Sequence, residues 1–303
     1  MHDSNRTYRG RFAPSPTGPL HFGSLVAAVG SYLDARASGG AWLVRMEDLD
    51  RPREAVGAAD AILGTLEAYG FEWDGTTMRQ SSRAPAYAAA LERLARDGAV
   101  FPCACTRREI ADSGLGADSE AAYPGTCRNG LPPGRAPRSI RVRVDDRVIA
   151  FEDRIQGRIE QNLARQVGDF VLRRADGLFA YQLAVVVDDF EQGITDVVRG
   201  ADLLTSTPRQ ILLQRLLGYP TPRYAHLPVA VNASGEKLSK QTLAAPLIPE
   251  DALSRIWEAL RFLGQSPPED LKASDVATLW AWARVNWNGE KVPRMRTGRA
   301  HQG

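Results

Sequence analysis

The sequence contains little cysteine, little lysine and no long apolar run. Its three cysteines are too few for a disulfide framework in a chain of 303 residues, and all three lie between positions 103 and 127. Nowhere do roughly 18 uncharged apolar residues follow one another, which argues against a transmembrane helix. The first six residues are not followed by the apolar segment of a secretory signal. We therefore expect a cytoplasmic protein that makes no membrane contact.

The charges of the chain nearly cancel. Against 38 Lys and Arg residues stand 36 Asp and Glu residues, which leaves a net charge of +2. A protein that attracts nucleic acid over its whole surface is thereby excluded, and any RNA contact has to come from a local patch. Candidates for such a patch are Arg107, Arg108, Arg128 and Arg135. The alternative is a solvated arginine-rich face without a ligand.

The N-terminal part of the chain is predicted to form a strand–helix–strand unit. A strand over residues 8–13 is followed by a helix from Gly23 that ends at Gly39 and Gly40, and then by the apolar strand Ala41–Met46. A continuous apolar run of this length is typical of a buried parallel strand. The pattern indicates an α/β fold, and 44% hydrophobic and 24% charged residues indicate a folded chain, for which we expect two lobes.

The rest of the chain is predicted to contain an irregular insert between regular elements. The segment 101–138 is rich in Cys, Gly, Pro and Arg, without sustained periodicity, and is expected to be a subdomain with little core. Helices are expected at 54–70, 84–98, 207–217 and over 249–287. Strands are expected at 139–151, 170–174, 179–187 and 227–231. A polar loop at 232–241 and a mobile tail from Asn288 complete the prediction.

Two segments carry the chemistry that the residues alone suggest. His21 and Gly23 lie in the connection between a predicted strand and the helix that follows it. Parallel sheets bind phosphate at such connections. Two of only four lysines, Lys237 and Lys240, lie three residues apart in one polar loop, where two ammonium groups can stabilise charge developing on phosphates. Each pattern alone is common, and its alternative is a surface histidine or a solvated turn.

Five motifs in order resemble the class I glutamyl-tRNA synthetases. They are Arg11–Gly18 followed by His21–Ser24, Arg45–Asp50, Tyr181–Asp189, Val198–Leu203 and Lys237–Gln241. Ser24 and Gln241 stand where that class usually has His and Ser, which puts their transition-state roles in doubt. The resemblance implies a Rossmann-like class I catalytic domain, with residues 1–100 as its first half and 191–245 as its second half. Between the halves, residues 101–190 are expected to form an inserted zinc-containing subdomain like those that bind tRNA acceptor ends. Residues 246–303 are expected to form a helical region with a mobile tail.

From the length of the chain we expect that it lacks the helical domain that reads the anticodon in those enzymes. This truncation, together with Cys103-Ala-Cys105 and a later cysteine, resembles the glutamyl-queuosine tRNA(Asp) synthetase family. The resemblance implies a monomeric ligase that activates L-glutamate with ATP and Mg²⁺, without tRNA, and transfers it to queuosine at the wobble position of tRNA(Asp). The alternatives are a glutamyl-tRNA synthetase-like fragment that charges an acceptor end, and a non-catalytic, zinc-containing module that binds RNA or nucleotide.

The resemblance also implies roles for individual residues. His21, Lys237 and Lys240 are the expected catalytic residues, and the residues expected to contact ATP are His21, Gly23, Ser24 and Lys240. Those expected to contact glutamate are Arg11, Phe12, Ala13, Pro14, Ser15, Glu47, Tyr181 and Arg199. The arginines suit a carboxylate and Glu47 suits an ammonium group, whereas the alternative for each is a structural ion pair.

The cysteines raise the question of a metal. Cys103, Cys105 and Cys127 supply three thiolates, but structural zinc takes four ligands and no histidine lies nearby in the sequence. Free buried cysteines are the alternative. The family resemblance implies Tyr123 as the fourth ligand of a Zn²⁺ ion.

Overall fold

The computed structural model describes residues 7–299 apart from 51–53, 112–122, 233 and 239–244. One end of the molecule contains a parallel sheet in the order β1-β2-β3, formed by β1 (Arg9–Phe12), β2 (Ala41–Met46) and β3 (Met78–Arg79). Helix α1 (Phe22–Ala37) connects β1 to β2 and buries Leu25, Val29 and Leu33, which are spaced four residues apart. The expected strand–helix–strand unit is therefore confirmed.

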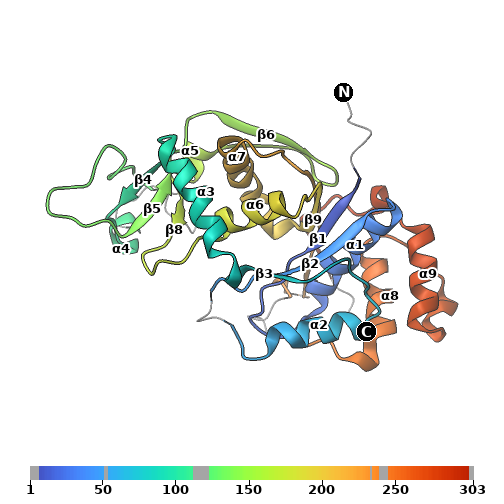
Figure 1. The fold of residues 1–303 in the computed structure, drawn as a ribbon. Helices are drawn as coiled ribbons and strands as arrows, with labels where there is room; N and C mark the ends of the chain where they lie inside the picture. The colour runs from blue at the N-terminus through green and yellow to red at the C-terminus, as the bar shows by residue number, and fades with distance from the viewer. Residues whose placement is uncertain (1–6, 51–53, 112–122, 233, 239–244, 300–303) are drawn as a thin grey trace.

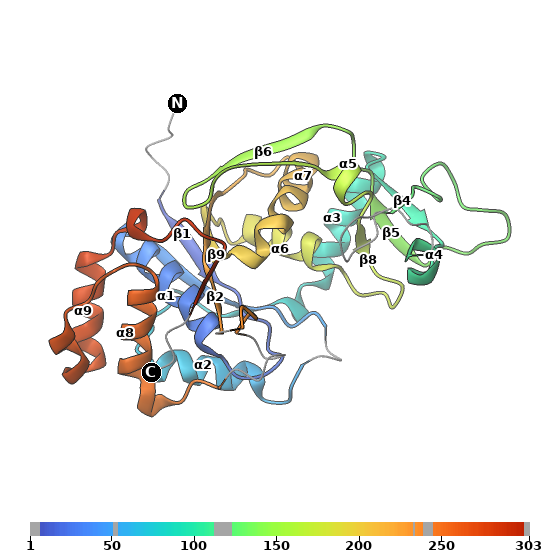
Figure 2. The same cartoon turned by 180° about the vertical axis from the view of Figure 1, so that it is seen from behind.

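A second group of strands lies beside this sheet. Its order is β7-β6-β10-β9, from β6 (Val148–Asp153), β7 (Gly157–Asn162), β9 (Asp196–Gly200) and β10 (Arg223–Leu227). Strands β6, β10 and β9 pair in parallel, whereas β7 pairs antiparallel with β6. The amide of Thr195, just before β9, donates to the carbonyl of Arg9 at 2.9 Å, and Figures 1 and 2 both show β9 beside β1. The carboxyl ends of β1, β2 and β9 therefore open on one edge, as in a Rossmann-like sheet.

The expected strand at 179–187 is wrong, because this segment forms helix α6 (Tyr181–Glu191). Its residues from Gln182 to Asp189 are all buried, so every face of the helix is covered and no polar stripe shows the helical period. A short, wholly apolar run such as Leu183–Val187 is equally compatible with a buried strand and with a buried helix. Helices α3 (Ala84–Arg96) and α7 (Thr207–Leu217) pack against α6, and both match the sequence prediction.

The segment expected to be a subdomain forms a lobe at the far end from α8 and α9 (Figure 1). It contains an antiparallel sheet in the order β4-β5-β8, formed by β4 (Val100–Cys103), β5 (Ser139–Val142) and β8 (Val171–Arg173). Short helices α4 (Arg107–Ala111) and α5 (Leu163–Gln166) flank this sheet. Its small separate core consists of Phe101, Cys103, Ala104, Tyr123 and Cys127.

The C-terminal region contains helices, as expected, and the described residues that follow them, up to Arg299, are part of the fold. Helices α8 (Ala252–Phe262) and α9 (Val276–Asn286) pack on α1, and α2 (Ala58–Ala68) joins the same core. The expected strand 227–231 is interrupted at Pro228, so β10 ends at Leu227 and a new strand β11 (Val229–Val231) begins. Strand β12 (Thr297–Arg299) pairs in parallel with β11, and Val292 is buried, so the prediction of a mobile tail is wrong for residues 288–299.

Short 3-10 helices complete the fold: η2 (Gln80–Ser82), η3 (Ala201–Ser206), η5 (Pro249–Asp251), η6 (Glu269–Ala273) and η7 (Gly289–Lys291). Among the residues that the structure describes, none of the helices has the length and apolar character that crossing a bilayer requires.

Candidate active site

A pocket of about 210 Å³ lies at the carboxyl ends of β1, β2 and β9. The N-terminus of α1, the first residue of α6 and the loop after β11 complete its wall. The lining residues that the sequence predicted as site residues are Arg11, Phe12, Ala13, His21, Gly23, Ser24, Glu47, Tyr181, Arg199 and Lys237. Residues from both predicted loops and from both halves of the sheet thus meet in one cavity.

His21 is the N-cap of α1. Its imidazole Nδ1 accepts a hydrogen bond from the amide of Ser24 at 3.3 Å, and its Nε2 lies 3.1 Å from the Ser24 hydroxyl. An Nδ1 that accepts from an amide carries no proton, so the proton of the neutral ring is on Nε2. The serine that replaces the usual histidine of the motif therefore helps to orient His21 on the rim of the pocket.

The loop that carries Lys237 passes directly over the start of α1. A Cβ added at Gly23 would lie 2.9 Å from the carbonyl oxygen of Leu238, so only glycine permits this approach. Lys237 Nζ lies 2.6 Å from Asp202 Oδ2, which holds the ammonium group at the mouth of the pocket. Lys240 and Gln241 lie outside the described residues.

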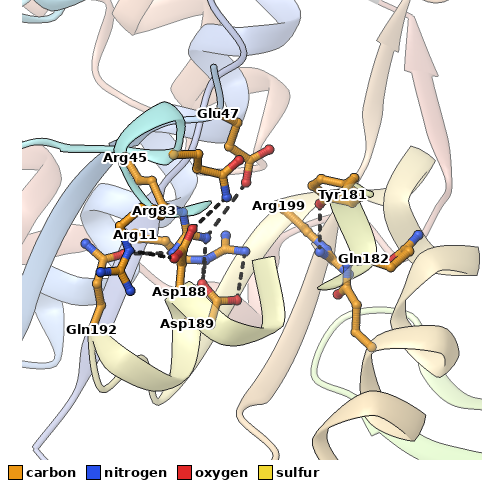
Figure 3. Close-up of polar contacts among 12 residues, drawn as sticks. Arg11, Arg45, Glu47, Arg83, Tyr181, Gln182, Asp188, Asp189, Gln192 and Arg199 are labelled. Carbon is orange, nitrogen blue, oxygen red and sulfur yellow. Dashed lines mark hydrogen bonds and ion pairs between the residues drawn. The ribbon is translucent and has the colours of Figure 1, made fainter. Parts of the chain in front are cut away.

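Arg11 and Arg45 share one buried carboxylate, that of Asp189 on α6 (Figure 3). Arg11 Nε lies 3.1 Å and Arg45 Nη2 2.7 Å from Asp189 Oδ1, while Arg45 also donates to Gln192 Oε1 at 2.7 Å. Burial opposes ionisation of Asp189, but the two guanidinium groups hold its pKa below the ordinary value. Arg11 is thus both an ion-pair partner and a lining residue of the pocket.

Glu47 follows β2 directly and is a buried carboxyl group in the pocket wall. Its side chain is 10% exposed, and its nearest ion-pair contact is Arg45 Nη2 at 3.8 Å. Burial raises the pKa of Glu47 from 4.5 to about 7, although Arg45, Arg11 and Arg199 act in the opposite direction. A carboxylate with so little contact with solvent is stabilised when a cationic group of a ligand binds beside it.

Arg199 on β9 faces Tyr181, the first residue of α6. Arg199 Nη1 donates to the Tyr181 hydroxyl at 3.4 Å, as Figure 3 shows, and both residues line the pocket. Arg199 is 5% exposed, and its remaining nitrogens contact Thr207, Gln210 and His226. The pocket therefore combines two buried guanidinium groups with one buried carboxyl group.

The three cysteines form a cluster in the lobe around β4. Their sulfur atoms all lie within 4.8 Å of one another, and Cys105 Sγ and Cys127 Sγ are 3.7 Å apart. The Tyr123 hydroxyl lies 3.4 Å from Cys103 Sγ and 3.9 Å from Cys105 Sγ. A hydrogen bond with Tyr123 and contacts with Arg141 outweigh burial and lower the pKa of Cys103 to about 7.

Some predicted residues lie apart from the pocket. Ser15 is exposed and is not among the lining residues, and Pro14 contributes a backbone contact, since its carbonyl accepts from the Glu47 amide at 2.9 Å. Of the proposed RNA-contacting arginines, Arg128 pairs with Asp169 and Arg135 with Glu109. Arg107 is exposed on α4.

Sequence reasoning missed several buried residues that support the pocket, namely Arg45, Asp153, Asp189 and His226. Arg45 and Asp189 lie inside quoted motifs, but a motif does not say which members touch each other. Asp153 and His226 belong to segments without any motif, so only the fold brings them together.

Comparisons with known proteins agree with this geometry. The model of the catalytic domain of class I tRNA synthetases (E and Q) matches residues 7–263, so the chain contains the catalytic domain of this class. The glutamyl-Q tRNA(Asp) synthetase of Dechloromonas aromatica is 65% identical over 292 residues, which cover 96% of this chain and 97% of the relative. The protein of the same name from Pseudomonas aeruginosa PAO1 is 54% identical, over 96% and 97% of the two chains. The chain belongs to the glutamyl-Q tRNA(Asp) synthetase family and is a ligase.

A solved structure shares the fold. The glutamate tRNA ligase from Elizabethkingia meningosepticum, determined in complex with its amino acid, has a TM-score of 0.81 at 27% identity. The match covers 98% of this chain and 67% of that one. The fold is therefore that of a class I catalytic domain, as the motifs predicted.

Proposed function

We propose that this enzyme activates L-glutamate with ATP to form glutamyl-adenylate, without tRNA, and then transfers the glutamyl group to queuosine at the wobble position of tRNA(Asp). The observation that carries the proposal is the pocket, which is lined by the guanidinium-bearing Arg11 and Arg199, by the carboxyl-bearing Glu47 and by residues at the N-terminus of α1. Glutamate has complementary charges, because it bears carboxylates and one ammonium group. The names of the relatives support the choice of tRNA substrate.

In this proposal Arg11 and Arg199 bind the side-chain carboxylate of glutamate, because a guanidinium group offers paired donors to a carboxylate. Glu47 binds the ammonium group, and the Tyr181 hydroxyl lies within reach of the same ligand. Phe12 and Ala13 form the apolar wall, while Pro14 and Ser15 act through the backbone of the turn after β1.

ATP is proposed to lie against His21, Gly23 and Ser24, where the N-terminal amides of α1 favour phosphate. The α-carboxylate oxygen of glutamate attacks the α-phosphorus, and the bond to pyrophosphate breaks. Lys237, Lys240 and the Nε2 proton of His21 stabilise the charge on the phosphates during this step. A hydroxyl of the queuosine cyclopentenediol then attacks the acyl carbon and AMP leaves. Class I synthetases use ATP and Mg²⁺, which neutralises phosphate charge when it is bound.

The cysteine cluster fits a zinc ion. With Zn–S bonds of about 2.3 Å, the edge between two sulfurs of a tetrahedron is about 3.8 Å. The separation of 3.7 Å between Cys105 Sγ and Cys127 Sγ matches this value. We propose that Cys103, Cys105, Tyr123 and Cys127 hold Zn²⁺, which would tie Tyr123 and Cys127 to the end of β4 in a lobe with a small core of its own.

The four-part division of the chain, the monomeric state and the cytoplasmic location are proposed together with this function. One detail supports a close connection between the parts, since Tyr181, which belongs to the 101–190 part, lines the same pocket as residues of 1–100 and 191–245.

The test has two stages. Exchange of labelled pyrophosphate into ATP is measured with glutamate and without tRNA, and we expect exchange that glutamate, but not glutamine or aspartate, supports. Transfer of labelled glutamate is then compared between tRNA(Asp) with queuosine, tRNA(Asp) without it, and tRNA(Glu). Charging of tRNA(Glu) would favour the acceptor-end alternative, and the absence of any exchange would favour the non-catalytic module.

A further inference from the structure

We infer that Asp153 and His226 are positioning residues for Arg199: the buried carboxylate fixes the tautomer of the imidazole, and the imidazole fixes the guanidinium group in the pocket. This inference rests on the proposed role of Arg199 in glutamate binding. Neither Asp153 nor His226 lines the pocket, so both act through Arg199 and not on the substrate.

Asp153 ends β6, and both oxygens of its carboxylate are used. Oδ1 accepts from the backbone amides of Ile155, Gln156 and His226 at 3.0, 2.9 and 3.1 Å. Oδ2 lies 2.6 Å from His226 Nδ1, and the side chains of Asp153 and His226 are fully buried. The carboxylate is thus locked in one orientation.

This arrangement determines where the imidazole proton lies. A carboxylate only accepts hydrogen bonds, so Nδ1 of His226 carries the proton and Nε2 of the neutral ring carries a lone pair. Burial opposes ionisation of Asp153, but the bond with His226 keeps its pKa below the ordinary value, and burial lowers the pKa of His226. Nε2 of His226 is therefore an acceptor, and it lies 3.1 Å from Nε of Arg199.

Arg199 is held along the edge that faces away from Tyr181. Nε donates to His226, and Nη2 donates to Thr207 Oγ1 and to Gln210 Oε1, both at 2.8 Å. Nη1 is oriented toward the Tyr181 hydroxyl, at the pocket wall. The three anchors therefore fix the plane of the guanidinium group before glutamate arrives, which reduces the ordering cost of binding.

The variant Asp153→Asn tests the tautomer. Three backbone amides require an oxygen at the Oδ1 position, so the amide NH₂ is directed at Nδ1 of His226. The ring then carries its proton on Nε2, where it opposes the N–H of Arg199. We expect the KM for glutamate in pyrophosphate exchange to rise roughly ten- to hundredfold, because a buried donor loses its acceptor. The KM for ATP is expected to stay within about twofold, since the position proposed for ATP lies at His21, Gly23 and Ser24 and not at Arg199.

A pair of variants at position 226 carries the test if Asp153→Asn does not fold. His226→Gln can place its amide oxygen near the position of Nε2, whereas the shorter side chain of His226→Asn cannot. We expect His226→Gln to keep most of the affinity for glutamate and His226→Asn to lose it. Tyr224→Phe is the matched control, because Tyr224 lies on the same strand as His226, and the change removes only the buried hydroxyl that accepts from Gln214 and leaves the anchors of Arg199 in place.

Nitrogen-15 NMR of labelled histidine reports the tautomer of His226 directly, so it distinguishes the inferred role from a purely structural one. The chain has four histidines, and the signals of His226 are those that disappear in His226→Gln. The ring is expected to be protonated on Nδ1 in the wild type and on Nε2 in Asp153→Asn.

The inference is overturned if Asp153→Asn folds and keeps the wild-type glutamate KM, if His226→Asn binds glutamate as well as His226→Gln, or if the wild-type ring is protonated on Nε2. Absence of glutamate-dependent exchange in the wild type would instead defeat the proposed function, and the NMR result would still decide the tautomer.

Discussion

Glu47 provides a quantitative prediction, because burial of its ionised carboxylate should lower the free energy of unfolding of the protein. The pKa of Glu47 is raised from 4.5 to about 7, so the folded state holds this proton more tightly than the unfolded state. The stability that this proton supports is present below pH 4.5 and is lost as the pH rises through 7. One pKa unit corresponds to about 1.4 kcal/mol, so the full loss at pH 8 is about 3 kcal/mol.

The variant Glu47→Gln removes the titrating group and keeps the shape of the side chain. We expect its free energy of unfolding, relative to the wild type, to increase by about 3 kcal/mol between pH 4 and pH 8. The pH-independent effect of the amide cancels in this difference. The same variant is expected to lose glutamate binding, because a neutral amide cannot neutralise an ammonium group. A gain in stability together with a loss of binding is expected when a residue binds a ligand but destabilises the folded protein.

Urea unfolding of both proteins, followed by circular dichroism at several pH values, measures the difference. The matched control is Glu67→Gln, which makes the same substitution at an exposed position of α2. A difference for Glu47→Gln that does not vary with pH would refute the reasoning, as would a decrease toward pH 8. Retained affinity for glutamate would separately contradict the assignment of Glu47 to the ammonium group.

Three further variants, the last with a matched control, test other parts of the structure. Asp189→Ala is expected to lower the free energy of unfolding by about 3–5 kcal/mol, because it removes the carboxylate that two buried guanidinium groups share; a loss below about 1 kcal/mol in urea unfolding would contradict this. Cys127→Ser is expected to release zinc, measured with a colorimetric chelator, and full metal content would argue against the site. Gly168→Ala is expected to lower the melting temperature and the zinc affinity, since its φ is +72° and a Cβ would lie 2.9 Å from backbone atoms of Tyr123. Gly177→Ala, with φ of +86° and open space around it, should show only the backbone strain.

The sequence allowed the pocket to be predicted where local motifs lie at strand ends. His21, Glu47 and Arg199 each follow or end a strand of one parallel sheet, and such ends meet at one edge whatever their separation along the chain. The two predicted loops also converge, since the carbonyl of Leu238 lies over Gly23.

The rest depended on tertiary contacts. Helix α6 could not be distinguished from a strand, because burial on all sides removes the periodic signal. The buried partners of the pocket arginines, Asp189 and His226, are separated from them by 178 and 27 residues, and no local pattern links them. The pairing of β11 with β12 likewise depends on a contact between distant segments that polar composition gave no reason to expect.

The parallel pairing of the last strand has a practical consequence for protein engineering. Val231 and Arg299 are partners in the register, so β11 and β12 end side by side. Lys237 follows Val231 by six residues along the chain. A purification tag or fluorophore joined soon after Arg299 would therefore emerge beside the segment that leads into the lysine loop. We advise fusing such groups at the amino end, because β1 begins at the opposite end of the strand from the carboxyl end that borders the pocket.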